Sequence, residues 1–129
     1  MSEPKLFIAI VDDDRSVCRA IGRLVRSLGM NADSFTSGQE FIDLIEAMPG
    51  WKADCVVLDV QMPGINGLDV QNRLSRLGRR MPVVFIAAHD DVYVRERAMA
   101  AGAVAFLRKP FDDELLIRTL KQALGAAAE

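Results

Sequence analysis

Acidic side chains follow two apolar stretches of the chain, at the point where each stretch ends. Asp12 and Asp13 come directly after residues 6–11, and the single carboxylate Asp59 follows residues 55–58. A buried strand that ends in carboxylates delivers them to one edge of a sheet, where like charges repel one another and are costly to desolvate. Such an edge usually holds a hard divalent cation with oxygen ligands, and Mg2+ is the ion that we expect here.

A lysine follows a third apolar stretch. Lys109 and Pro110 come shortly after residues 103–107, so the edge that carries the carboxylates would also carry a cation. Carboxylates, a metal ion and a lysine at the carboxyl ends of parallel strands make a site suited to phosphoryl groups, because the cations stabilise dispersed negative charge. The Lys109-Pro110 bond is also a candidate cis peptide, since cis bonds occur mainly before proline.

Composition limits the classes of function. The chain has 129 residues, 50% of them hydrophobic, and a formal net charge of -2, which predicts one globular domain over residues 1–129. No apolar run is long enough to cross a bilayer, the first residues lack the apolar region of a signal peptide, and the near-neutral charge argues against direct nucleic-acid binding. We therefore expect a cytoplasmic protein, in which Cys18 and Cys55 are packing residues and not a redox pair or metal ligands.

Short apolar runs alternate with segments of helical period along the chain. This alternation is typical of an α/β fold with a doubly wound parallel sheet and helices on both faces. The apolar runs predict strands at residues 6–11, 30–35, 55–58, 83–87 and 103–107. A helix is predicted after each strand, so the expected domain has five strands and five helices. The second strand is expected near an edge of the sheet.

Capping residues and apolar stripes set the expected helix bounds. Ser37 and Glu40 have the spacing of a capping box at the start of the second helix, and Asp112 can cap the last helix. The helix expected at about residues 92–101 has a poor apolar stripe, so weak packing makes it the element that should shift most easily. Three apolar residues at the ends of the other stripes are expected to face inward: Leu28, Met48 and Leu77.

These motifs resemble those of one family over essentially the whole chain. Three motifs are jointly specific at their intervals: Val-Asp-Asp-Asp at 11–14, Leu-Asp-Val-Gln-Met-Pro-Gly at 58–64 and Lys-Pro-Phe at 109–111. The chain resembles the receiver domain of two-component response regulators, which is CheY-like in fold, a flavodoxin-like arrangement. Residues 62–68, 89–92 and 101–107 look most like the FixJ-like branch. The resemblance implies five parallel strands in the order 2-1-3-4-5.

The resemblance also implies a role for each residue of the predicted site. Asp59 would accept a phosphoryl group from a histidine kinase or a phosphotransfer protein in a Mg2+-dependent reaction. Lys109 and the backbone of Ala88 would bind the phosphoryl oxygens. The implied Mg2+ ligands are Asp12, Asp13, Asp59 and the backbone carbonyl of Gln61. Such a chain is a signalling module and not an enzyme, and its fourth helix and fifth strand offer a face for a homodimer.

One position departs from the pattern of this family. Members usually have Thr or Ser at the end of the fourth strand, where the hydroxyl binds the phosphoryl group and moves inward with an aromatic residue of the fifth strand. This chain has Ala87, which donates no side-chain hydrogen bond, so we expect altered switching. Phe106 occupies the aromatic position, although an ordinary core phenylalanine explains it equally well. Gln61 and His89 could modulate hydrolysis of the acyl phosphate, and an ordinary loop histidine is the alternative for His89.

Two other functions stay open at this point. A pseudo-receiver would bind partners without phosphorylation, and Ala87 favours that alternative. A phosphatase of the haloacid dehalogenase type would use Asp12 as its nucleophile and Asp14 as its acid-base, because an Asp-x-Asp follows the first strand. The phosphatase alternative leaves Asp59 without a role and asks for a longer chain.

Arginines recur in two places with helical spacing. The first set lies on the polar side of the first helix, which adjoins the kinase-docking surface in the family, although a solvated helix face explains the set as well. The second set lies toward the end of the third helix and implies no particular partner. The two sets are Arg15, Arg19, Arg23 and Arg26, and Arg73, Arg76, Arg79 and Arg80. Neither identifies the kinase or the downstream partner.

Overall fold

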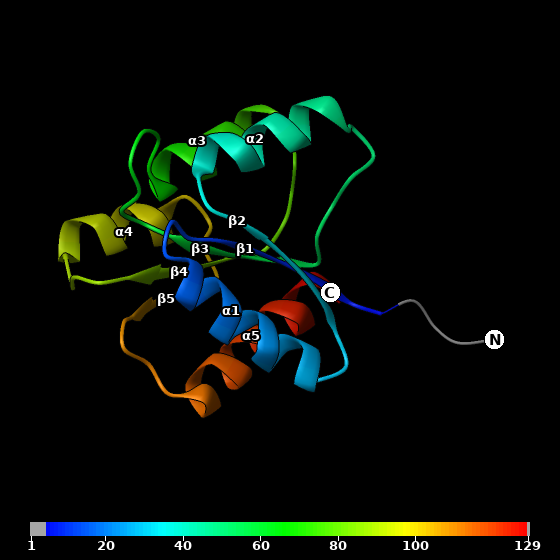
Figure 1. Ribbon diagram of the computed structural model, residues 1–129. Coiled ribbons are helices and arrows are strands. Elements are labelled where there is room, and N and C mark those ends of the chain that lie inside the picture. Colours follow the sequence, from blue (N-terminus) through cyan, green and yellow to red (C-terminus); the bar gives the residue numbers. More distant parts are fainter. Residues whose placement is uncertain (1–4, 129) are drawn as a thin grey trace.

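Parallel strands form the centre of the molecule (Figure 1). The computed structural model describes residues 5–128, and its strands are β1 (Phe7–Val11), β2 (Asn31–Phe35), β3 (Cys55–Asp59), β4 (Val83–Ala87) and β5 (Ala105–Arg108). Within these residues the five strands pair in the order β2-β1-β3-β4-β5, and every pairing is parallel. The predicted strand order and the edge position of the second strand are confirmed. β5 begins two residues later than predicted.

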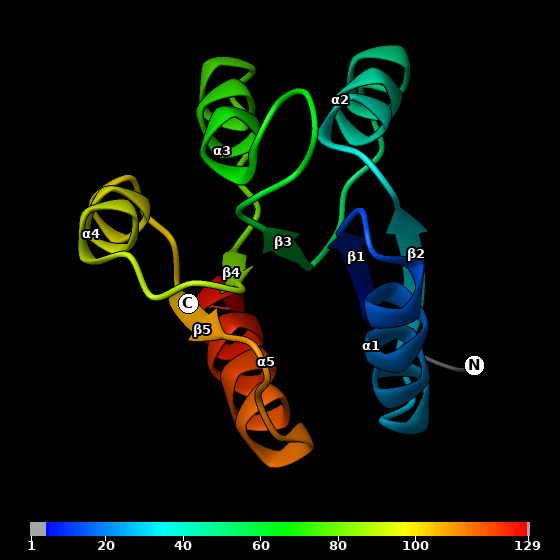
Figure 2. The same cartoon turned by 60° about the vertical axis from the view of Figure 1, so that its left-hand side comes forward.

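Helices cover both faces of this sheet. They are α1 (Arg15–Ser27), α2 (Gly38–Ala47), α3 (Gly67–Arg76), α4 (Val92–Ala100) and α5 (Asp113–Ala128). α1 and α5 lie on one face, whereas α2, α3 and α4 lie on the other (Figure 2). The predicted doubly wound α/β fold is confirmed. Among residues 5–128, no helix is both long and apolar enough to cross a membrane.

Alternate strand residues build two cores, one on each face of the sheet. In β1, Ala9 and Val11 belong to the core under α2 and α3, while Ile8 and Ile10 belong to the core under α1 and α5. All residues of β3 and β4 are buried. Strands that are buried on both faces give continuous apolar runs in the sequence, which is why the pattern predicted them well.

Side-chain caps begin all five of the described helices, and the cap of α2 differs from its prediction. The Ser37 hydroxyl accepts a hydrogen bond from the Glu40 amide at 3.0 Å, but the Glu40 carboxylate accepts from the Thr36 amide at 3.2 Å and not from the N-cap residue. The complete capping box is instead at α3, between Asn66 and Asp69. As predicted, Asp112 caps α5 through a 2.7 Å hydrogen bond from the Leu115 amide.

In three helices the predicted apolar stripe includes one residue beyond the end of the helix. Leu28, Met48 and Leu77 occupy C-cap positions and are 38%, 51% and 41% exposed, so the expectation that they face inward is wrong. The helices end at these residues, and at α1 the C-cap is followed by Gly29 with a positive φ of 82°. Cys55 is buried as predicted, and burial raises the pKa of its thiol to about 12, which suits a packing residue.

Candidate functional site

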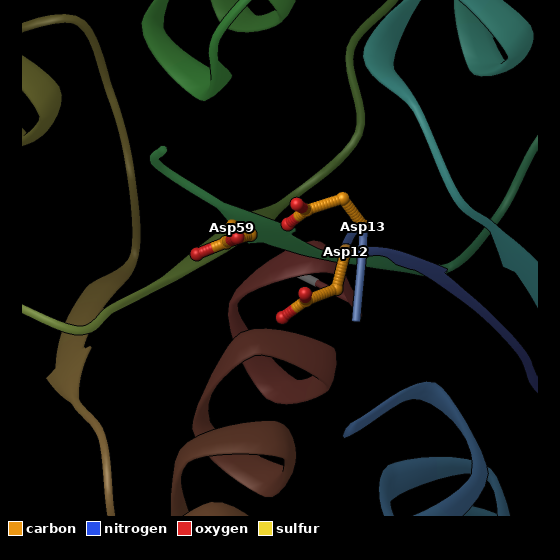
Figure 3. A group of neighbouring side chains, drawn as sticks. All are labelled: Asp12, Asp13 and Asp59. Carbon is orange, nitrogen blue, oxygen red and sulfur yellow. The ribbon is translucent and has the colours of Figure 1, made fainter. Parts of the chain in front are cut away.

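Three carboxylates converge at the carboxyl edge of the sheet (Figure 3). Asp12 and Asp13 follow β1, Asp59 ends β3, and one carboxylate oxygen of each lies within 4.8 Å of the others. Asp12 and Asp59 are buried, whereas Asp13 is exposed. The structure therefore brings together the carboxylates that the sequence analysis placed at one edge, and it leaves one side of the cluster open to solvent.

Strand register explains why these side chains meet. β1 and β3 are neighbours with Val11 opposite Leu58, so the next residue of each strand lies at the same level of the sheet. The Asp12 amide donates to the Phe35 carbonyl at 3.0 Å, which prolongs the β1–β2 ladder by one residue. The backbone of Asp12 is thereby held by the sheet and not by a free loop.

Lys109 joins the two buried carboxylates. Its Nζ donates to Asp12 Oδ2 at 2.8 Å and lies 3.3 Å from Asp59 Oδ1. The other oxygen of Asp12 accepts a 2.8 Å hydrogen bond from the Asp14 amide. The Lys109 amide donates to the Ala87 carbonyl at 2.7 Å, and the Lys109-Pro110 peptide is cis, as predicted.

The charges of the cluster do not balance. Burial and the nearby charge of Asp12 raise the pKa of Asp59 from 3.8 to about 6, although Lys109 opposes the rise. Burial by itself would lower the pKa of Lys109, but its hydrogen bond to Asp12 and the charges of both carboxylates raise it overall. Three carboxylates and one ammonium group leave two net negative charges. A further cation would therefore favour the ionised form of Asp59.

The donor set fits Mg2+. Carboxylate oxygens are the hard ligands that this ion takes, and it usually keeps several waters beside one or two carboxylates. The exposed side of the cluster, at Asp13, leaves room for such waters. Gln61, whose backbone carbonyl is the fourth ligand implied by the family resemblance, is exposed and lies two residues beyond Asp59.

Asp14 has a different task from its neighbours. Its Oδ1 accepts hydrogen bonds from the Ser16 amide at 2.9 Å and from the Ser16 hydroxyl at 2.6 Å, and Asp14 is the N-cap of α1. The hydrogen bonds from Ser16, that of the hydroxyl first, lower the pKa of Asp14. Asp14 thus stabilises the start of a helix and does not join the carboxylate cluster.

The end of β4 offers no hydroxyl group. Ala87 is its last residue and is buried, and the exposed residues Ala88 and His89 follow in the loop to α4. Phe106 lies on the neighbouring strand β5, partly buried, with its ring centroid 6.1 Å from that of Phe85. The side-chain hydroxyl that a Thr or Ser would supply is therefore missing from the edge.

Gly67 is a residue of the site that the sequence analysis did not assign. A Cβ atom at this position would overlap the Asp59 carbonyl oxygen and would lie 3.0 Å from both the Phe85 ring and the Cα of Val60. Glycine thus lets the start of α3 approach the strand that carries Asp59. The Asn-Gly pair at the start of the helix was the available sequence signal, but only the fold reveals the close approach.

Two of the arginines near the end of α3, Arg73 and Arg79, have structural partners. Arg73 pairs with Glu46 of α2 at 3.1 Å. Arg79 donates to the carbonyls of Ile45 and Trp51, and so braces the end of α2 and the segment that leads to β3. In α1, Arg15, Arg19 and Arg23 are exposed.

Comparisons with known proteins identify the family. Residues 8–121 match the model of the response regulator receiver domain. The response regulator protein TmoT of Ectopseudomonas mendocina is 38% identical over 129 residues, which are 100% of this chain and 57% of TmoT. The transcriptional regulatory protein FixJ of Azorhizobium caulinodans is 37% identical over 122 residues, 95% of this chain and 56% of FixJ. The chain thus spans about half the length of the curated relatives that it matches.

Solved structures agree with this match. A response regulator receiver protein from Burkholderia phymatum has 60% sequence identity and a TM-score of 0.83, with 94% of this chain and 96% of that chain covered. The crystal structure of FixJ-N has 28% sequence identity and a TM-score of 0.84, with 95% of this chain and 96% of that chain covered. The chain therefore belongs to the response regulator receiver domain family, whose members are phosphoryl-accepting signalling modules of two-component systems that interact with histidine kinases or phosphotransfer proteins.

Proposed function

We propose that Asp59 accepts a phosphoryl group from a histidine kinase or a phosphotransfer protein in a reaction that requires Mg2+. The observation that carries this proposal is the position of Lys109, whose ammonium group lies 2.8 Å from Asp12 and 3.3 Å from Asp59. A fixed cation beside a buried carboxylate can neutralise the oxygens of an incoming phosphoryl group. Membership of the family supports the same assignment.

The proposed chemistry begins with the ionisation of Asp59. The carboxylate must be ionised to attack phosphorus, yet burial and Asp12 raise its pKa to about 6, so nearby cations favour the reactive form. Lys109 and the backbone of Ala88 hold the phosphoryl oxygens during transfer. Mg2+, when bound, supplies positive charge that offsets the charge gathered at this edge. Its proposed ligands are Asp12, Asp13, Asp59 and the backbone carbonyl of Gln61.

We propose that switching is altered because Ala87 replaces the usual Thr or Ser. Without a hydroxyl at this position, the phosphoryl group has less differential interaction with the active arrangement of α4 and Phe106. A ligand shifts a conformational equilibrium only by that difference. Gln61 and His89, both exposed, are proposed to control how water reaches the acyl phosphate.

The proposed partners follow from exposed surfaces. The basic side of α1, with Arg15 and Arg19 exposed, is proposed to contact the kinase. The face formed by α4 and β5 is proposed to form a homodimer, because Val92 and Tyr93 are 58% and 66% exposed there. The proposed setting is the cytoplasm, and this domain is proposed to contact neither membrane nor nucleic acid directly.

A pseudo-receiver that works without phosphorylation is the second candidate, and Ala87 is the observation that favours it. The phosphatase candidate has less support. It assigns the acid-base role to Asp14, which is engaged as the N-cap of α1, and it leaves the Lys109–Asp59 contact without a purpose.

Intact-mass spectrometry after incubation with acetyl phosphate and Mg2+ tests the proposal. We expect one added phosphoryl group in the native chain, and none in Asp59→Asn or in the presence of EDTA. Asp14→Asn is the matched control, because asparagine also caps helices well, and it should be labelled as the native chain is. Labelling of Asp59→Asn but not of Asp12→Asn would support the phosphatase, and no labelling of the native chain would support the pseudo-receiver.

A further inference from the structure

The guanidinium group of Arg95 lies over the ring of Phe106. Its central carbon is 5.9 Å from the ring centroid, and the same group forms an ion pair with Asp90. Arg95 belongs to α4, Phe106 to β5, and Asp90 to the loop between β4 and α4. One side chain therefore ties a helix, a strand and a loop together at the side of the site where the proposed switch residues lie.

The remaining contacts of α4 make this tie important. Between residues 92 and 100, Ala98 is the buried residue. The Ala98 carbonyl accepts a 3.0 Å hydrogen bond from Gln71 of α3, so the carboxyl half of α4 has an anchor in the core. Near its start, Val92 and Tyr93 are exposed. The amino half of α4 therefore contacts the core through the partly buried Val94 and contacts the Phe106 ring through Arg95.

Asp90 and Asp91 have separate tasks in the loop. Asp91 caps α4, with its Oδ1 accepting from the amides of Tyr93 and Val94 at 3.0 and 3.3 Å. Asp90 is left to pair with Arg95. Asp90 lies two residues beyond Ala88, whose backbone is proposed to bind the phosphoryl group. A shift of that backbone would therefore move Asp90 and disturb its ion pair with Arg95.

We propose that Arg95 is a positioning residue that holds Phe106 and the 88–91 loop in the arrangement of the unphosphorylated protein. The release of Phe106 rests on the proposed phosphorylation of Asp59, whereas the contacts of Arg95 with Phe106 and Asp90 are present without it. Cation–π contacts and exposed ion pairs are each weak, and the Arg95 and Asp90 side chains are 42% and 43% exposed. Weak contacts suit this role. Without a hydroxyl at position 87, phosphorylation favours the active arrangement by only a small free energy, and only weak contacts can be broken by it.

The test follows the ring signals of Phe106 by NMR in protein with 13C-labelled phenylalanine, before and after addition of beryllofluoride and Mg2+. Beryllofluoride stands in for the phosphoryl group on Asp59. Arg95→Met keeps the stem and removes the charge, and Arg95→Lys keeps a charge. Arg97→Met is the matched control, because its guanidinium carbon lies 5.7 Å from the ring of Tyr93 on the same helix. Phe106→Leu assigns the signals.

In Arg95→Met we expect the unliganded Phe106 signals to move toward the positions that beryllofluoride gives in the native chain. Because coupling is reciprocal, the beryllofluoride concentration for half response should fall, by about fivefold. Arg95→Lys should lie between native and Arg95→Met, and Arg97→Met should match native. Native Phe106 signals in unliganded Arg95→Met, or equal shifts in Arg97→Met, would overturn the proposal. Native Phe106 signals that ignore beryllofluoride would also overturn the proposal, because Phe106 would then not respond to the occupied site. Phosphorylation of Asp59 is decided separately, by the mass-spectrometry test.

Discussion

Replacing Asp59 by asparagine should stabilise the protein when no divalent metal is present. The native carboxylate is buried beside Asp12, and its pKa is raised from 3.8 to about 6. Asparagine has the same shape and no charge to desolvate, so the variant loses the electrostatic cost along with the phosphoacceptor. A substitution that abolishes the proposed function should therefore improve the fold.

The sign and size follow from the direction of the pKa shift. A folded pKa above the unfolded value means that the native state binds more protons between pH 3.8 and about 6, so stability is lost as the pH rises through this window. The shift of about two units corresponds to at most about 3 kcal/mol. Solvent on the open side of the cluster screens part of this cost, and we expect a gain of about 1–2 kcal/mol for Asp59→Asn at pH 8. About half of the gain should remain at pH 5, which lies inside the window.

Urea unfolding of native and variant chains in EDTA at pH 5 and pH 8 measures this gain. Asp14→Asn is the control with the opposite sign: hydrogen bonds from Ser16 lower the pKa of Asp14, so its contribution is lost only as the pH falls below about 4. Its difference from native should be equal at the two pH values. An Asp59→Asn variant no more stable than native at pH 8, or a gain independent of pH, would refute the reasoning.

Three further results are expected. Millimolar Mg2+ should raise the melting temperature of the native chain by mass action, and Asp13→Ala should flatten the response; a flat native response would favour the pseudo-receiver. Gly67→Ala should lower the free energy of unfolding in urea by about 1–3 kcal/mol, because the added Cβ would overlap the Asp59 carbonyl oxygen. Gly50→Ala is the control, because its Cβ meets open space, and it should change the free energy of unfolding little. Equal changes in the two variants would contradict this. Ala87→Thr should enlarge the amide shifts that beryllofluoride induces in α4 and β5, by adding one charge-assisted hydrogen bond of about 1.5–3 kcal/mol; a full response already present in the native chain would show a route that needs no hydroxyl.

The strands and the site edge were predictable because both depend on local sequence. A strand buried on both faces must be apolar throughout, so the runs that end at Val11 and Leu58 were visible without the fold. The residue after each run necessarily lies at the carboxyl edge, which placed Asp12 and Asp59 together. The strand order came from the family resemblance, because alternation of strands and helices alone leaves several orders open.

Features that depend on contacts between distant segments were not predictable. The apolar stripe of α1 predicted that Leu28 faces inward, but Leu28 is the C-cap and is exposed. Periodicity alone does not show where a helix ends. Gly67 matters through its distance to Phe85, and Arg95 through its distance to Phe106. None of these neighbours is close in sequence.

Lys109 has two tasks that cannot be performed at the same time. Without another cation, its ammonium group neutralises Asp12 and Asp59 at 2.8 and 3.3 Å. The proposed transfer needs the same group to face the phosphoryl oxygens. A cation held by the carboxylates would take over the neutralising task and leave Lys109 free to turn toward the phosphoryl group. The metal requirement of the proposed reaction thus follows from the excess of carboxylates over lysine as much as from the charge on phosphorus.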